Sequence, residues 1–185
     1  YSFESTTTNS ISIAGSSDFL VDNFTISVWI KPNSTTSATR RVVEYGNAKW
    51  GGASYGWLIS QFDQRIFWYF QSSGPSITTT SNLTAGNWHH IAIRVNRSGQ
   101  AVFIDGIQRG SKTAIKHLTV VDDINIGTIA GSQSYSGGID DFRLFPKALS
   151  NNEIETLASG YNVGQDVTLS GLSTEISNIS VTGSG

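Results

Sequence analysis

Apolar and polar residues alternate in short runs along most of this chain. Phe24 to Lys31 is the clearest run, since every second residue is apolar, at Phe24, Ile26, Val28 and Ile30. A side-chain period of two is that of a half-buried β-strand. Trp29 falls on the opposite face, which predicts that this face is covered too. Pro32 cannot donate a ladder hydrogen bond, so the strand is expected to end there.

Similar runs predict further strands, separated by polar, glycine-rich turns. Asp105-Gly106 is a strong signal for a tight turn between two of them. The predicted strands span residues 10–14, 41–45, 57–61, 65–71, 77–81, 88–96, 100–104, 107–109, 120–126 and 139–145. This pattern predicts an all-β sandwich or jelly roll in the 185-residue chain, with no second fold class.

The stretch from Gly137 to Ser159 joins the last of these strands to a short helix. Pro146 ends the strand, and Ser150 with Glu153 three residues later forms a capping-box pattern for a helix over 151–159. Gly160 can adopt the left-handed conformation that ends a helix. A period of two in the strand places Asp140, Phe142 and Leu144 on one face and Ile139, Asp141, Arg143 and Phe145 on the other.

Composition removes several classes of function. Only 12 Lys and Arg and a net charge of -2 provide no basic field for nucleic acid. No apolar run approaches the ~20 residues of a membrane span, so membrane insertion is not expected. The chain contains no cysteine, which excludes disulfides and thiolate chemistry. Residues 161–185 are rich in Ser, Thr and Gly, and we expect them to be a linker or a docking arm whose short alternations could pair as strands.

Three segments resemble the laminin-G-like branch of the concanavalin A-like lectin/glucanase superfamily. They are FTISVWIKP (24–32), NWHHIAIRV with the following AVFIDG (87–106), and GGIDDFRLFPKALSNNEI (137–154). The resemblance covers residues 1–160. It implies a two-sheet antiparallel jelly-roll sandwich with one short C-terminal helix. Such modules often bind carbohydrate or protein, often hold calcium, and occur extracellularly, on cell surfaces and on virion surfaces.

Aromatic residues on loops are the candidate ligand contacts, because sugars lay their C–H faces on aromatic rings. Trp50 and Tyr55 lie on a glycine-rich loop, with Asn47, Lys49 and Gln71 as polar neighbours and Tyr135 as a further candidate. Trp50 could equally cover an open sheet edge as a lid on the core. Trp57, Trp68 and Tyr69 lie in strands and are expected to pack in the core or on a sheet face.

Asp140 and Asp141 are the candidate metal ligands, together with Glu4. Similar jelly rolls often hold calcium between an N-terminal segment and the last strand, which is the reason for including Glu4. Adjacent strand residues point to opposite faces, so without a bulge only one of the two aspartates can bind an ion directly. The alternative is structural: Asp140 accepts backbone amides and Asp141 pairs with an arginine. Asp122-Asp123 is a weaker pair, more typical of a solvated turn.

Catalysis is not expected. Retaining glucanases of this superfamily use a Glu-x-Asp-x-x-Glu strand motif, and the chain has no such triple. His89 and His90 lie in a strand where packing is the simpler role.

Two functions remain open from the sequence. One is a non-catalytic surface recognition module that binds a glycan or a glycosylated partner and is stabilised by calcium. The other is a structural or decoration module of a virion or extracellular fibre, whose tail docks on neighbouring subunits.

Overall fold

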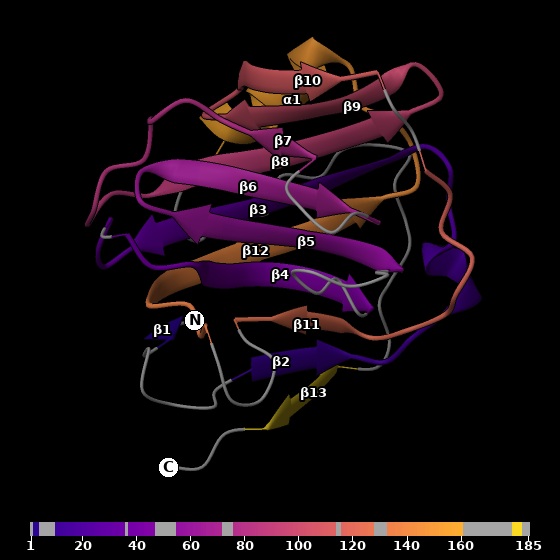
Figure 1. The fold of residues 1–185 in the computed structure, drawn as a ribbon, viewed down its shortest axis with the longest axis horizontal. Helices are drawn as coiled ribbons and strands as arrows, with labels where there is room; N and C mark the ends of the chain where they lie inside the picture. Colours follow the sequence, from indigo (N-terminus) through magenta and orange to yellow (C-terminus); the bar gives the residue numbers. More distant parts are fainter. Residues whose placement is uncertain are drawn as a thin grey trace.

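The computed structural model describes residues 2–3, 10–35, 37–46, 55–71, 76–113, 116–127, 133–160 and 179–182. Within these residues the chain forms a six-stranded sheet, sheet A, and a seven-stranded sheet, sheet B (Figure 1). Sheet A has the order β1 (Ser2–Phe3), β12 (Gly137–Phe145), β3 (Phe24–Pro32), β8 (His89–Asn96), β9 (Gly99–Ile104) and β10 (Ile107–Lys112). Sheet B has the order β13 (Ile179–Thr182), β2 (Ser10–Ile13), β11 (Ile124–Ile126), β4 (Arg40–Gly46), β5 (Gly56–Phe62), β6 (Arg65–Phe70) and β7 (Ile77–Thr78).

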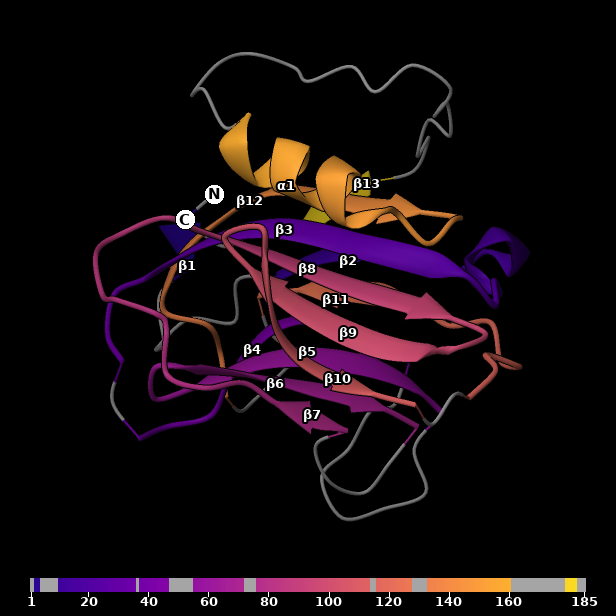
Figure 2. The ribbon, with the colours of Figure 1, turned by 90° about the horizontal axis from the view of Figure 1, so that it is seen from above.

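The layers are stacked in a simple order. Helix α1 (Asn151–Ser159) lies on the outer face of sheet A, and sheet B lies on the other side of sheet A (Figure 2). The paired strands in both sheets run antiparallel. The predicted fold class is therefore confirmed.

No helix in the described part of the chain is long and apolar enough to cross a membrane.

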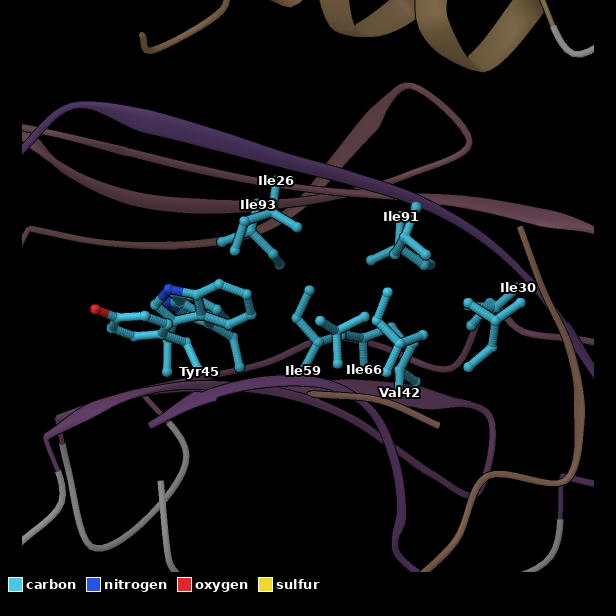
Figure 3. Packing of buried hydrophobic residues seen from close by; sticks show 14 of the residues in the cluster. Ile26, Ile30, Val42, Tyr45, Ile59, Ile66, Ile91 and Ile93 are labelled. Carbon is cyan, nitrogen blue, oxygen red and sulfur yellow. The ribbon is translucent and has the colours of Figure 1, made fainter. Parts of the chain in front are cut away.

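One apolar layer fills the space between the sheets (Figure 3). Ile26, Ile30, Ile91 and Ile93 of sheet A face Val42, Tyr45, Ile59 and Ile66 of sheet B. Trp57 and Trp68 are fully buried in the same layer, as the sequence predicted. The indole nitrogen of Trp68 donates to Oε1 of Gln100 over 2.7 Å, so this buried N–H, which would be costly if unpaired, is satisfied by a residue of the other sheet.

Helix α1 closes a second, smaller apolar cluster on the outer face of sheet A. Ile154 and Leu157 pack there with Phe103, Phe145 and Leu149. Both hydrogen bonds of the predicted capping box between Ser150 and Glu153 are present. The prediction for the other end is wrong: Gly160 has φ -88°, not a left-handed conformation, and its N–H donates to the Thr156 carbonyl.

A β-bulge in β12 overturns the predicted alternation of faces. Asp140 pairs with Trp29 and Arg143 with Ser27, so Asp141 and Phe142 together face the single residue between them on β3. Asp141 has φ +48°, which marks the bulge. As a result Ile139 belongs to the main core, and Phe142 and Leu144 pack against that same core.

Two predicted strands are shorter than the sequence suggested. Only Ile77–Thr78 of the predicted 77–81 pairs, and only Ile124–Ile126 of the predicted 120–126. In the second case residues 121–123 have no regular structure, and Oδ1 of Asp122 accepts the N–H of Asp123. β3 ends at Pro32, as predicted, and Pro32 lies opposite Gly137 in the strand pairing.

His90 lies on the outer face of sheet A and is fully buried. Its Nε2 lies 2.9 Å from Oγ of Ser27, its ring lies against Trp29 at 5.3 Å, and its Nδ1 has no hydrogen-bond partner. Burial lowers the pKa of His90 to about 4; Asp105 opposes this shift and Arg143 adds to it. The native ring is therefore neutral at neutral pH.

The folded state should lose stability as the pH falls from 6.5 toward 4. In this window the unfolded chain binds a proton at His90 that the native chain does not, so the loss should reach at most about 3 kcal/mol. Urea unfolding at pH 7 and pH 4.5 measures it. His90→Asn should remove most of this pH dependence, while the control His117→Asn should keep it. An unchanged pH dependence in His90→Asn would contradict the assignment.

Candidate functional site

The structure describes some of the predicted ligand contacts and leaves others outside its range. Trp50, Asn47 and Lys49 lie outside the described residues, as does Glu4. Their proposed roles stay predictions. Tyr55, Gln71 and Tyr135 are described, and the three have different surroundings.

Tyr135 is not a surface residue, so its prediction as a ligand contact is wrong. Its exposed fraction is 0% and it belongs to the main core. Burial raises the pKa of its phenol far above the ordinary value. A loop position before the last strand suggested exposure, but the loop folds inward here: the N–H of Tyr135 donates to the Gly127 carbonyl over 2.7 Å.

Tyr55 is exposed at one end of the sandwich, where β4 and β5 come together. Its exposed fraction is 38%. A Cβ built on Gly46 would lie 3.4 Å from Cδ2 of Tyr55 and 3.6 Å from Cβ of Asp122, so the ring and the carboxylate flank this glycine. Val121, which precedes Asp122 in the chain, is exposed at 48%. We call Tyr55, Gly46, Val121 and Asp122 the Tyr55 end.

Three hydrogen bonds fix the segment 116–123, which carries Val121 and Asp122, to β4 and to Gly15. The hydroxyl of Tyr45 donates to the Val120 carbonyl over 2.7 Å, and burial raises the pKa of Tyr45, which keeps that hydroxyl protonated. The N–H of Gly15 donates to Oδ1 of Asp123 over 2.8 Å. The N–H of Gly46 donates to the Asp123 carbonyl over 3.1 Å. The Tyr55 end is therefore a pre-formed surface.

Gln71 helps to hold this end. Its Nε2 donates to the His117 carbonyl over 2.6 Å, and its own carbonyl accepts from Nζ of Lys116 over 3.0 Å. Its N–H donates to the carbonyl of Gly56, next to Tyr55. Gln71 thus lies near Tyr55, as predicted, but its amide N–H group already has a protein partner. The geometry gives it a positioning role.

The two aspartates of β12 do not form a metal site with other described residues. Asp141 accepts from Nε of Arg143 over 2.7 Å, and Oδ1 of Asp140 accepts the N–H of Asp141 over 2.9 Å. No group of three His, Cys, Asp or Glu suited to a metal occurs among the described residues. Because calcium needs six to eight oxygen ligands, this arrangement does not by itself fit the ion. Calcium binding with Glu4 stays a prediction.

A second polar cluster lies on the face of sheet B that points away from the core. Glu44, Leu58 and Tyr69 pair across β4, β5 and β6, and each is flanked along its strand by core residues. Glu44 forms an ion pair with Arg41. Burial raises the pKa of Tyr69 to about 12, although a hydrogen bond with Ser60 and the positive charge of Arg41 both lower it. Glu44 and Tyr69 are 1% and 3% exposed, so they are less accessible to a ligand than Tyr55.

His89 resembles half of a catalytic pair, but both its nitrogens are in use. Nδ1 lies 2.8 Å from Oδ2 of Asp105, and Nε2 accepts the N–H of Thr84 over 3.0 Å. Burial raises the pKa of Asp105, but the hydrogen bonds from His89 and from the His90 amide outweigh it and hold this pKa below its usual value. The ring cannot take a proton from a substrate at Nε2 without losing Thr84. It joins a turn to the end of β9.

Sequence reasoning missed Asp122 and Val121 as parts of a surface site. The run from 120 to 126 was predicted as a single strand, and the aspartate pair as a solvated turn. Two adjacent valines do not fit a period of two, and that break was the available signal. Only the fold places Asp122 beside Gly46 and Tyr55.

Comparisons with known proteins agree with this architecture. The chain is 31% identical over 147 residues to botulinum neurotoxin type X of Clostridium botulinum, a match that covers 76% of this chain and 11% of the toxin. It is also 31% identical over 151 residues to the adhesion G-protein coupled receptor V1 of Danio rerio, covering 75% of this chain and 2% of the receptor. The chain thus spans only a small part of each relative.

Solved structures with this fold include a SAP-like pentraxin from Limulus polyphemus, with a TM-score of 0.68 and 18% identity over 88% of this chain and 82% of that one. Domain 4 of the extracellular arabinanase AbnA from Geobacillus stearothermophilus, in complex with arabinotriose, has a TM-score of 0.64 and 20% identity over 80% and 72%. The CBM40 of a Ruminococcus gnavus sialidase, bound to sialyllactose, has a TM-score of 0.63 and 14% identity over 75% and 83%.

The laminin-G-type family model described as the concanavalin A-like lectin/glucanases superfamily matches residues 5–155. This range contains all three segments that carry the resemblance in the sequence. The matched range and the two-sheet sandwich agree, and the chain belongs to the laminin-G-like branch of the concanavalin A-like lectin/glucanases superfamily.

Proposed function

We propose that this domain is a non-catalytic recognition module that binds carbohydrate, or a glycosylated partner, at the Tyr55 end. The observation that carries the proposal is the exposed Tyr55 ring beside the Asp122 carboxylate, with Gly46 between them. An aromatic face accepts the C–H face of a sugar, and a carboxylate accepts its hydroxyl groups. Gly46 has φ +67°, and a Cβ there would lie 2.7 Å from the Tyr55 carbonyl oxygen, so this close approach of the two strands requires glycine.

The groups at this end are suited to a neutral, hydroxyl-rich ligand. Oδ1 of Asp122 accepts the N–H of Asp123, which fixes the carboxylate and leaves Oδ2 available. Val121 adds apolar surface on one side. Trp50, Asn47 and Lys49 belong to the same β4–β5 connection as Tyr55, so we retain them as proposed contacts. Two domains of the same fold are described with arabinotriose and with sialyllactose, which supports a glycan as the ligand class.

The relatives also support the proposed location. Two relatives that match the chain are named as a neurotoxin and as an adhesion receptor, and on this basis we propose an extracellular or surface-exposed role for this domain. Calcium remains part of the proposal as a stabilising ion, with Asp140, Asp141 and Glu4 as its candidate ligands.

Tyr55→Ala should weaken glycan binding roughly tenfold, because the ring supplies the stacking surface. Tyr55→Phe keeps the ring and should bind nearly as well as the wild type, whereas Asp122→Asn should bind more weakly. Trp50→Ala should also lose affinity. A glycan array identifies the sugar, and calorimetry then measures each variant with and without a calcium chelator.

Ile107→Ala is the matched control, because Ile107 is exposed at 55% on β10, an edge strand of the other sheet. It should leave the affinity unchanged. If the wild type binds no glycan on the array, the proposed function is wrong. If it binds one but Tyr55→Ala binds it equally well, the site lies elsewhere.

A second candidate function rests on β13. Residues Ile179–Thr182 pair antiparallel with β2 at the edge of sheet B, so the predicted tail strand forms within its own chain. The same backbone hydrogen bonds could be made by β13 of a neighbouring copy, because an edge strand accepts any strand of suitable register. We infer a role as a structural module whose C-terminal strand can join subunits of a virion or extracellular fibre.

Deleting residues 161–185 should then abolish self-association of the full chain. Removing only residues 183–185 leaves β13 in place and should preserve it. Light scattering coupled to size-exclusion chromatography over a range of concentrations measures both. A full chain that is monomeric at every concentration, or a 161–185 deletion that associates as well as the full chain, rules out exchange of this strand.

A further inference from the structure

The outer face of sheet B carries an apolar cluster that does not belong to the main core. Leu58 and Tyr69 form this cluster, and Phe67 packs against it. The strand register places them on the side away from sheet A, because Ile59 and Trp68, their neighbours along β5 and β6, belong to the main core. An antiparallel sheet usually presents polar residues to water on this side, so the cluster marks an unusual surface.

Phe62 extends this cluster to the end of the β5–β6 hairpin. Its ring stacks on Phe67, with 5.5 Å between the ring centres and 28° between the ring planes. The ring of Phe67 in turn lies 6.4 Å from that of Tyr69. Exposure increases along this row, since Tyr69 is buried whereas Phe67 and Phe62 are half-buried. The open end of the cluster is therefore at Phe62.

Arg65 lies beside these rings on the same face of the sheet. It pairs with Phe62 across the hairpin, and it is two residues from Phe67 along β6. Its side chain is exposed, and its Nε donates to Oγ of Ser81 over 3.3 Å. That bond restrains the guanidinium and leaves its two terminal nitrogens as donors. We call Phe62, Arg65 and Phe67 the hairpin face.

Polar residues flank the rings on both sides. On β7, Thr78 pairs with Phe67 and is exposed. On β5, Ser60 pairs with Phe67 from the other side. Arg41 of β4 follows in the same row, and its charge is neutralised by Glu44. Thr78 therefore offers an exposed hydroxyl group beside the aromatic rings, and Arg65 offers the charge.

The positive charge of Arg65 has no direct acidic partner in the part of the chain that the structure describes. Asp63 lies in the hairpin turn, but no ion pair joins it to Arg65 among the described residues. A charge beside an apolar surface is screened by less water than a fully hydrated one, so it attracts an anionic group more strongly. The hairpin face thus combines an aromatic surface with one positive charge.

We propose that the hairpin face is a second carbohydrate site, one that takes a sugar carrying a carboxylate. The C–H face of the sugar ring stacks on Phe62, and its carboxylate accepts hydrogen bonds from the terminal nitrogens of Arg65. A planar guanidinium can bind both carboxylate oxygens at once. Charge complementarity selects this ligand over a neutral sugar, and Thr78 can bind one of its hydroxyl groups.

This site is distinct from the Tyr55 end. Gly56, which follows Tyr55, begins β5, and Phe62 ends it. A strand of this length separates the two sites by about 20 Å. The charged group also differs, since the Tyr55 end has the carboxylate of Asp122 and the hairpin face has a guanidinium. Each site can therefore fail without the other.

Titration of ¹⁵N-labelled full chain, followed by NMR, tests the site. The probes are glucuronate and N-acetylneuraminic acid, two carboxylated sugars, at matched ionic strength. Glucose supplies a sugar ring without the charge, and acetate supplies a carboxylate without the ring. We expect saturable shifts of the Arg65 Nε–H and Phe62 backbone signals with at least one carboxylated sugar, with a dissociation constant on the order of 1–10 mM. Glucose and acetate should each bind at least roughly fivefold more weakly, because each lacks one contact.

Arg65→Gln should weaken binding of the carboxylated sugar roughly tenfold. The fold should stay intact in this variant because Arg65 is exposed. Phe62→Leu keeps an apolar side chain but removes the ring, and it should weaken binding roughly fivefold. Arg97→Gln is the matched control, because it removes an exposed arginine from the β8–β9 turn of the other sheet. It should bind as the wild type does.

Tyr55→Ala should also keep the wild-type affinity at the hairpin face. If the Arg65 shifts disappear in Tyr55→Ala, the sugar binds at the Tyr55 end and the proposal is wrong. Shifts that do not saturate by about 50 mM of either carboxylated sugar would overturn it as well. The same holds for shifts that glucose or acetate reproduces at equal concentration, or that Arg65→Gln leaves unchanged.

Discussion

The rest of this structure depends on one shared apolar layer between two sheets. Each strand contributes every second side chain to that layer. The residues that pack in the core therefore decide which side chains of the same strand face outward. Ile59 and Trp68 face inward, and their neighbours Leu58 and Tyr69 therefore face outward from sheet B. The same constraint sends Arg94 to the outer face of sheet A, since Ile93 and Val95 belong to the core.

Functional positions lie where this layer stops. At one end of the sandwich, hydrogen bonds from Tyr45, Gly46 and Gly15 attach the 116–123 segment to the strands beside it. Those bonds convert a stretch without regular structure into a fixed support for Val121 and Asp122. On the outer face of sheet A, helix α1 covers part of the sheet.

Two aspartates of the 116–123 segment lie at the Tyr55 end. The Gly46 N–H donates to the Asp123 carbonyl, and Cβ of Asp122 lies beside Gly46. The buried charges and titratable groups have structural roles: Glu44 is paired with Arg41, and His90 stays neutral because burial lowers its pKa.

The sequence alone determined the architecture. Alternation at Phe24 to Lys31 and the capping box at Ser150 depend only on neighbours along the chain, so the strand and the helix start could be predicted from local physics. The family resemblance added the two-sheet arrangement. The exposure of Tyr55 could also be predicted, because an aromatic residue in a glycine-rich loop tends to lie at the surface.

Tertiary structure decided the features that depend on residues distant in sequence. The bulge at Asp141 changed which side chains of β12 face the core, and no period-of-two pattern could indicate an extra residue. The Tyr135 ring is buried in the main core, a position that depends on residues distant in sequence. Asp122 lies beside Gly46, as Tyr55 does, because the fold brings together backbone segments that the sequence keeps apart.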